Sequence, residues 1–205
     1  TCPPAPYTMG ALIHDAERLL EALDVRDCVF VGLSIGGMIA QGLAAKRLDL
    51  VRAVVLSNTA PKIGTRAMWE ERIAMVESQG LSAMSDTIMT RWFSKDFRES
   101  PQVAPWKRMV ETTPPAGYAG CSAAIAGSDF YASTAKLRLP ALVIAGSEDG
   151  STPPDLVQEL AGLIPGAHYA LIRGAGHLPC VEKPAEFVGH LNDFLRAIGH
   201  LDTKQ

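Results

Sequence analysis

Apolar residues follow two patterns along the chain, stripes with helical spacing and short continuous runs. The first stripe comprises Met9, Leu12, Ile13, Ala16, Leu19, Leu20 and Leu23. This spacing places all of them on one face of a helix. Thr8 stands directly before the stripe, and threonine is a favoured N-cap residue. The pattern therefore predicts an amphipathic helix over residues 9–24.

Short apolar runs predict four strands: Cys28–Leu33, Val51–Ser57, 141–145 and His168–Ile172. Strands that are apolar almost throughout are typical of a parallel sheet with both faces covered. Helical stretches follow three of these runs, reaching residue 47 after the first and spanning 153–163 and 184–198 after the last two. Alternating strands and helices predict an α/β fold with a mostly parallel sheet and helices on both faces.

The alternation stops between residues 61 and 137, where no strong strand pattern occurs. Helices are predicted there at Arg66–Gln79, 81–93, 106–111 and 118–126, with a polar break at 94–105. All three tryptophans and five of the seven methionines lie in this segment. Ordinary helix packing would explain them, but an inserted lid with an adaptable apolar lining is favoured because the segment interrupts a regular alternation.

The chain is accordingly divided into three parts. Residues 1–60 are expected to form the first part of the core, residues 61–137 the helical lid, and residues 138–205 the rest of the core. A length of 205 residues is compatible with one domain that carries an inserted subdomain.

The stretch Gly32-Leu33-Ser34-Ile35-Gly36 follows the first strand and precedes a helix. A serine between glycines at such a junction is typical of a nucleophile elbow, a strained turn that lifts the hydroxyl above the sheet. Glycine is expected at both flanking positions because a side chain there would collide in so tight a turn. The motif alone is common in ordinary loops, but the strand before it and the helix after it favour Ser34 as a nucleophile. A serine hydroxyl also needs partners, because it is a poor nucleophile unless a base takes its proton.

Two later strands supply such partners. Asp149 follows the 141–145 strand and His177 follows the His168–Ile172 strand. The carboxyl ends of parallel strands meet at one edge of a sheet, so these side chains can converge on Ser34. The order serine, aspartate, histidine is the one expected for the α/β-hydrolase fold. The residue types suit the chemistry, because a histidine can take the serine proton and an aspartate can orient the histidine.

Each partner also has an ordinary interpretation. Asp149 alone would be read as a residue that shapes a turn or caps a helix, and His177 alone as a loop histidine. Glu148 is a rival acid, but its neighbouring place on the loop points it elsewhere. Three suitable residues in the expected order after three strand ends favour the catalytic interpretation.

Composition narrows the possible partners. The net charge is −3 and no basic run occurs, so nothing favours nucleic acid or a membrane surface. The cysteines show no zinc-ligand spacing, and neither a metal nor another cofactor is expected. They are interpreted as reduced thiols of a cytoplasmic protein, with a chance disulfide as the alternative: Cys2, Cys28, Cys121 and Cys180.

Six stretches carry a resemblance that spans nearly the whole chain: 6–9, 30–38, 60–65, 91–93, 113–118 and 145–154. They resemble the α/β-hydrolase superfamily and, within it, the 3-oxoadipate enol-lactonases of the β-ketoadipate pathway. Residues 62–65 and 113–118 are lid features and are the more specific of these stretches. The resemblance implies an α/β-hydrolase fold with an inserted helical lid.

The resemblance also implies an activity in aromatic-compound catabolism, the hydrolysis of a small enol-lactone that bears a free carboxylate. Ser34 would attack the ring carbonyl with help from His177 and Asp149, and the Ile35 N–H would donate to the oxyanion. The substrate carboxylate requires a cation or several donors. Candidates for binding the substrate are Arg91, Trp92, Trp106, Lys107, Arg108 and Arg138.

Other enzymes of the same fold use the same three residues. Carboxylesterases, carbon–carbon bond hydrolases and cofactor-free perhydrolases therefore remain alternatives, which only the lid distinguishes. A haloalkane dehalogenase is disfavoured because position 34 would be aspartate. A non-catalytic ligand-binding relative is the alternative from another class, and the complete set of Ser34, Asp149 and His177 argues against it.

The α/β-hydrolase fold requires strands before the 9–24 helix, and the sequence predicts none there. Those strands, one helix and their connections would occupy about 55–65 residues. The sequence is therefore expected to represent the C-terminal three-quarters of a domain. We expect the missing N-terminal segment of that domain to be a partner of this chain and to carry the second oxyanion donor.

Overall fold

The computed structural model describes residues 3–202 and contains a parallel sheet with the strand order β1-β2-β3-β4. The strands are β1 (Cys28–Leu33), β2 (Val51–Ser57), β3 (Ala141–Gly146) and β4 (His168–Ile172). The hydrophobic runs predicted all four strands to within one residue. Because the strands are parallel, their carboxyl ends all lie at one edge of the sheet.

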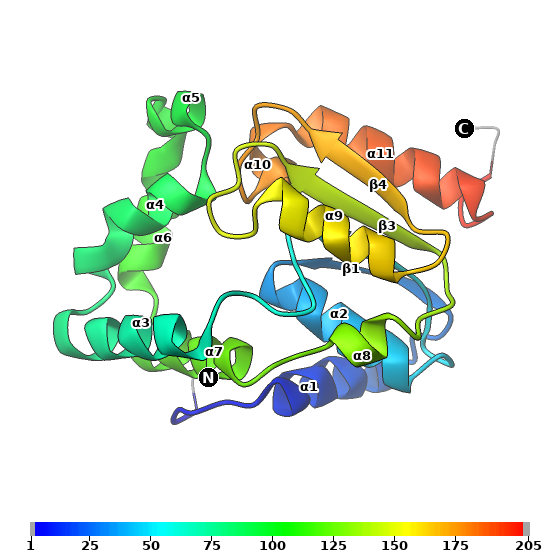
Figure 1. Ribbon diagram of the computed structural model, residues 1–205, viewed down its shortest axis with the longest axis horizontal. Helices are drawn as coiled ribbons and strands as arrows, with labels where there is room; N and C mark the ends of the chain where they lie inside the picture. The colour runs from blue at the N-terminus through cyan, green and yellow to red at the C-terminus, as the bar shows by residue number, and fades with distance from the viewer. Residues whose placement is uncertain (1–2, 203–205) are drawn as a thin grey trace.

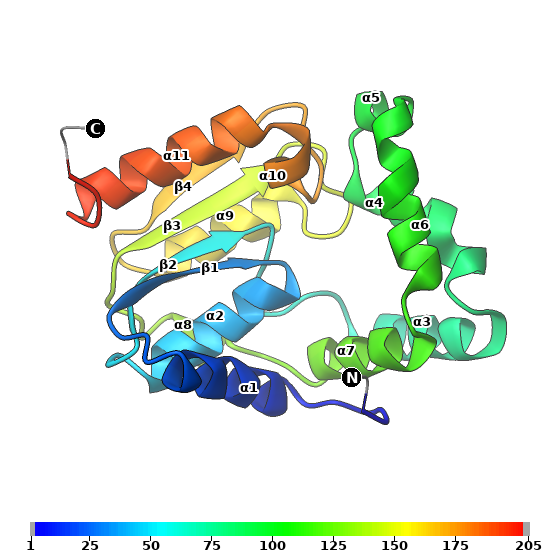
Figure 2. The ribbon, with the colours of Figure 1, turned by 180° about the vertical axis from the view of Figure 1, so that it is seen from behind.

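Helices cover the two faces of the sheet unequally (Figures 1 and 2). On one side lie α2 (Ile35–Lys46), α8 (Tyr131–Thr134) and α9 (Pro154–Leu163), and α1 (Met9–Ala22) packs along α2. On the other side α11 (Pro184–Ala197) runs beside β3 and β4. The predicted N-cap is confirmed, since the Thr8 hydroxyl accepts a hydrogen bond from the Ala11 N–H at 3.2 Å.

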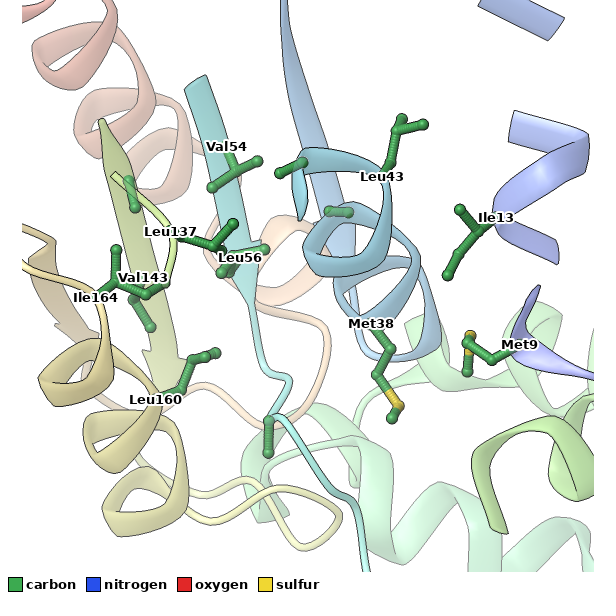
Figure 3. Close-up of a cluster of buried hydrophobic side chains, with 14 of the residues drawn as sticks. Met9, Ile13, Met38, Leu43, Val54, Leu56, Leu137, Val143, Leu160 and Ile164 are labelled. Carbon is green, nitrogen blue, oxygen red and sulfur yellow. The ribbon is translucent and has the colours of Figure 1, made fainter. Parts of the chain in front are cut away.

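Alternate residues of the central strands enter two separate hydrophobic clusters. Val54 and Leu56 of β2 face α2 and α9, and Figure 3 shows them with Met38 and Leu160 of those helices. Val55, between them in sequence, joins the cluster under α11 instead. The two-residue period of a strand divides its side chains in this way. The nearly continuous apolar sequence of β2 follows from burial on both faces.

The segment between β2 and α8 forms a group of helices beyond the carboxyl ends of the strands (Figure 1). These are α3 (Arg66–Gln79), α4 (Ser85–Trp92), α5 (Lys95–Arg98), α6 (Ala104–Thr112) and α7 (Pro115–Ala126), with 3₁₀ turns at Ser82–Met84 and Pro101–Val103. They have a hydrophobic cluster of their own, built around Ile88, Phe93 and Val110. We refer to α3–α7 as the lid.

Sequence periodicity missed the shortest helices. The predicted polar break at 94–105 contains α5 and a 3₁₀ turn, which begin where the hydroxyls of Ser94 and Ser100 accept backbone hydrogen bonds. Helices α8 and α10 (Pro179–Glu182) were not predicted either. Each spans four residues, which is too short for a 3.6-residue hydrophobic period to be recognisable.

One further sequence expectation concerns the cysteines. Cys28 and Cys180 carry free thiols, as the reduced-thiol interpretation predicts, whereas Cys2 lies outside the described residues. Within residues 3–202, no helix combines the length and the apolar character that crossing a bilayer requires.

Candidate active site

Ser34 occupies a strained turn between β1 and α2. Its φ of 56° and ψ of −121° lie in a region that a non-glycine residue rarely adopts, at a typical cost of about 1–3 kcal/mol. The surrounding structure holds this conformation from both sides. The Ser34 N–H donates to the Ser57 carbonyl at 3.0 Å, and the Thr59 hydroxyl donates to the Ser34 carbonyl at 2.7 Å. The strained backbone expected of a nucleophile elbow is therefore present.

The glycines around Ser34 are not equivalent. A Cβ on Gly32 would lie 2.2 Å from the Gly36 carbonyl oxygen, so only glycine fits there. The same expectation is wrong for Gly36, because a Cβ there would point into open space with no atom within 4 Å. The second close approach is one residue later, where a Cβ on Gly37 would lie 2.4 Å from the Thr59 side chain.

Asp149 and His177 form a buried pair. The Nδ1 atom of His177 lies 2.8 Å from Oδ2 of Asp149, and their side chains are only 5% and 0% exposed. The other carboxylate oxygen accepts hydrogen bonds from the N–H groups of Ser151 and Thr152. A carboxylate can only accept, so Nδ1 of His177 carries the proton and Nε2 is left to act as a base. Glu148, the rival acid, instead accepts from the Lys95 N–H.

Asn58 joins the acid loop to the histidine loop. Its amide nitrogen donates to Oδ2 of Asp149 at 2.9 Å and to the Gly176 carbonyl at 3.2 Å. The Ser57 hydroxyl donates to its amide oxygen, which fixes the orientation of the amide. The sequence analysis missed this buried residue. It directly follows β2, so the search for polar residues after strand ends that found Asp149 would also have found it.

A cavity of about 270 Å³ lies between the lid and the carboxyl ends of the strands. Ser34, Ile35 and His177 contribute to its lining from the sheet side. Ile35 is the first residue of α2, where a helix leaves its N–H groups without intrahelical partners. Among the described residues no hydrogen bond joins Ser34 to His177, and such contacts often close only when substrate binds.

Two arginines line the same cavity from the lid, Arg72 on α3 and Arg91 on α4. No salt bridge within residues 3–202 involves either side chain, and the Nε of Arg91 is buried without a hydrogen-bond partner. Burial lowers the pKa of the Arg91 guanidinium, and the nearby charge of Arg72 lowers it further. The cavity therefore contains two guanidiniums that form no salt bridge with a carboxylate of the described residues.

Arg72 was missed from the sequence, although its position carried a signal. Trp69, Arg72 and Val76 are three and four residues apart on α3, so they share one helix face. Trp69 and Val76 are buried, and the Arg72 guanidinium lies 5.1 Å from the Trp69 ring centre. An arginine on a buried stripe is unusual enough to mark a candidate binding residue.

The other substrate-binding candidates divide into those at the cavity and those elsewhere. Trp92 lines the cavity, as expected. Trp106 does not line it, because its ring packs 6.0 Å from that of Phe93 in the hydrophobic cluster of the lid. Lys107 is paired with Asp86 on the exposed side of the lid, and Arg108 is exposed.

Arg138 is also placed away from the cavity. Its guanidinium donates to the carbonyls of Ala135 and Leu137, in the connection that leads into β3. A residue that precedes a parallel strand lies at the amino end of that strand, across the sheet from the site. The expectation that Arg138 contacts substrate is therefore wrong for this arrangement.

Comparison with known proteins identifies the family. Residues 2–190 match the model of the alpha/beta hydrolase family. The chain belongs to the α/β hydrolase family. This hydrolase is 34% identical over 188 residues to 3-oxoadipate enol-lactonase 2 of Acinetobacter baylyi, in an alignment that covers 90% of the chain and 70% of that enzyme.

Solved structures agree with this assignment. An enol-lactonase from Burkholderia xenovorans superposes with a TM-score of 0.90 at 34% identity, covering 95% of this chain and 75% of that one. A hydrolase from Pseudomonas aeruginosa superposes with a TM-score of 0.89 at 37% identity, covering 95% and 74%. The predicted α/β-hydrolase fold and the resemblance to enol-lactonases are thus confirmed.

The buried acid of this hydrolase is held in its ionised form. Burial alone raises the pKa of the Asp149 carboxyl, but hydrogen bonds from His177, Asn58 and the Thr152 N–H outweigh it. The pKa consequently lies below the usual aspartate value. A carboxyl whose pKa is lower in the folded state than in the unfolded state stabilises the fold. This stabilisation is fully present above the unfolded-state pKa of about 4, and it is lost as the pH falls through the folded-state pKa.

Replacing Asp149 with asparagine removes that titration. Between about pH 5 and pH 2, the free energy of unfolding of the wild type should fall more steeply than that of Asp149→Asn. Urea denaturation across this range measures both slopes. Parallel pH dependences of the two proteins would show that Asp149 has no lowered pKa in the folded state.

Proposed function

We propose that this hydrolase uses Ser34 as a nucleophile to open 3-oxoadipate enol-lactone, a small lactone with a free carboxylate, to 3-oxoadipate. One observation carries the proposal. The cavity next to the elbow serine and the Asp149–His177 pair also contains two guanidiniums without carboxylate partners, Arg72 and Arg91. The similarity to the enol-lactonases of Acinetobacter baylyi and Burkholderia xenovorans supports the choice of lactone.

In the acylation step, Nε2 of His177 takes the hydroxyl proton of Ser34 as Oγ attacks the ring carbonyl carbon. Negative charge develops on the carbonyl oxygen, where the Ile35 N–H donates a hydrogen bond. Collapse of the tetrahedral intermediate breaks the ring C–O bond. The ring oxygen leaves with the proton that Nε2 of His177 had taken, so the leaving group is an enol. The enol tautomerises to the ketone, while the acyl group remains on Ser34.

In the second step, water attacks the acyl-enzyme carbonyl while His177 takes one of its protons. The C–O bond to Ser34 breaks, and His177 returns the proton to the serine oxygen. The product acid releases its remaining proton to water and leaves as a carboxylate, and the enzyme regains its starting state. Asp149 remains ionised throughout and stabilises the imidazolium that forms in each step.

The two arginines account for recognition of the substrate carboxylate. A cation in an apolar, partly buried cavity is costly unless an anion pairs with it. A carboxylate accepts two parallel hydrogen bonds from one guanidinium, so Arg91 or Arg72 offers geometric as well as electrostatic selection. The carboxylate end of the lactone is then held by the lid while its ring carbonyl faces Ser34.

Substitution of the nucleophile tests the mechanism. Ser34→Ala should lower kcat for the enol-lactone by about 10⁴ or more, because the nucleophile is lost, and should abolish labelling by a fluorophosphonate probe. Mass spectrometry of the labelled protein locates the adduct. The exposed Ser78→Ala on α3 is the matched control and should label like the wild type. Undiminished labelling of Ser34→Ala would exclude Ser34 as the nucleophile.

Substitution of the cavity arginine tests substrate recognition. Arg91→Met should lower kcat/KM for the carboxylate-bearing lactone by about ten- to a hundredfold, as loss of a charged hydrogen bond predicts. Hydrolysis of the neutral ester p-nitrophenyl acetate should change far less. Arg138→Met, which removes an arginine outside the cavity, serves as the control. An equal loss for both substrates would contradict a carboxylate-binding role.

A further inference from the structure

One carboxylate joins the histidine loop to the lid. Glu182 is the last residue of α10, which lies between the sheet and the lid helices in Figure 2. Its Oε1 accepts a hydrogen bond from the Gly176 N–H at 2.7 Å, one residue before His177. Its Oε2 accepts from the Ser94 N–H at 3.0 Å and also from the Ser94 hydroxyl. The two oxygens of Glu182 thus bind two different segments.

The same two segments also meet through their backbones. The His177 N–H donates to the Trp92 carbonyl at 2.7 Å, and the Gly150 N–H of the acid loop donates to the Arg91 carbonyl at 3.1 Å. The end of α4 therefore supplies backbone acceptors to both loops of the candidate triad. The position of His177 depends directly on where this part of the lid lies.

Gly176 permits this close approach. A Cβ at Gly176 would lie 2.5 Å from the Trp92 carbonyl oxygen and 2.9 Å from the Cα of Phe93. Any other residue would force the lid and the histidine loop apart. The junction also excludes water from Ser94, which is 3% exposed.

The chemistry of the junction makes the carboxylate important. Hydrogen bonds to an ionised acceptor are roughly twice as strong as neutral ones. A buried N–H that loses its acceptor costs its full desolvation penalty. Without the Glu182 carboxylate, the N–H groups of both Gly176 and Ser94 would be left in this state. None of these contacts belongs to the Ser34–His177–Asp149 set, so the catalytic steps alone do not explain why Glu182 is there.

We propose that Glu182 is a positioning residue, which fixes the backbone of the histidine loop against the lid and thereby orients the His177 imidazole toward Ser34. The proposal rests on the function proposed above, because it assigns His177 the role of base. Glu182 touches no substrate. It acts on Gly176 and Ser94, and through them it aligns His177 with the cavity wall that carries Arg91 and Trp92.

The substitution Glu182→Gln tests the proposal with almost no change in shape. The glutamine side chain keeps one acceptor oxygen and replaces the other with an NH₂ group, which cannot accept. Either the Gly176 N–H or the Ser94 N–H therefore loses its acceptor. At a temperature where the variant is folded, kcat should fall by about ten- to a hundredfold while KM changes little. A kcat within twofold of the wild type in the folded variant would overturn the proposal.

Two further variants separate positioning from general stability. Glu186→Gln makes the same chemical change at an exposed site on α11 and should retain wild-type kcat. Ser94→Ala removes only the hydroxyl donor and should lower kcat by less than Glu182→Gln does. Because Ser94 acts through Glu182, the double variant should be no slower than Glu182→Gln alone. Losses that multiply would show independent effects and refute the link.

A readout without turnover keeps this proposal distinct from the proposed function. Proton NMR follows exchange with water of the His177 Nδ1–H that bonds to Asp149. In Glu182→Gln and in Ser94→Ala this proton should exchange faster than in the wild type, by about tenfold or more in the first variant. Unchanged exchange in both variants would overturn the positioning role. If the wild type did not turn over the enol-lactone but the Nδ1–H still exchanged faster in the two variants, only the proposed function would be contradicted.

Discussion

The hydrogen bond between Asp149 and His177 is the interaction on which the rest of the site depends. It fixes the imidazole so that one nitrogen remains available as a base, and this requires a carboxylate that stays ionised although it is fully buried. Backbone N–H groups and the Asn58 amide provide that stabilisation. The parallel sheet makes this network possible. The carboxyl ends of β2, β3 and β4 lie at one edge, so the loops that carry Asn58, Asp149 and His177 meet there.

One short segment of the lid, Arg91 and Trp92 at the end of α4, makes two kinds of contact with the site. Arg91 and Trp92 line the cavity with their side chains, while their carbonyls accept hydrogen bonds from the acid and histidine loops. Under the proposed function, the end of α4 therefore links substrate selection to the alignment of the base. The cavity is apolar for most of its lining, so the two guanidiniums of Arg72 and Arg91, which have no carboxylate partner, are the feature that most restricts the substrates it suits.

Sequence alone predicted the elements and residues that obey simple periodic or positional rules. The strands, the long helices and the partnership of Asp149 with His177 follow from hydrophobic runs and from polar residues after strand ends. Contacts between residues far apart in the sequence were harder to predict, because they follow no periodic pattern. Residue type alone could not distinguish Trp106 from Trp92, because only the tertiary structure places Trp106 beside Phe93. In the same way it could not distinguish Arg138 from Arg91, because only the tertiary structure places Arg138 at the amino end of β3.

The preference of the wild-type enzyme for a free carboxylate tests the account most directly. The measurement is kcat/KM for 3-oxoadipate enol-lactone against the same lactone with its carboxylate converted to the methyl ester. The positive cavity predicts that the free acid is preferred by about ten- to a hundredfold. Equal turnover, or a preference for the neutral ester, would contradict a site built around Arg72 and Arg91 for an anionic lactone.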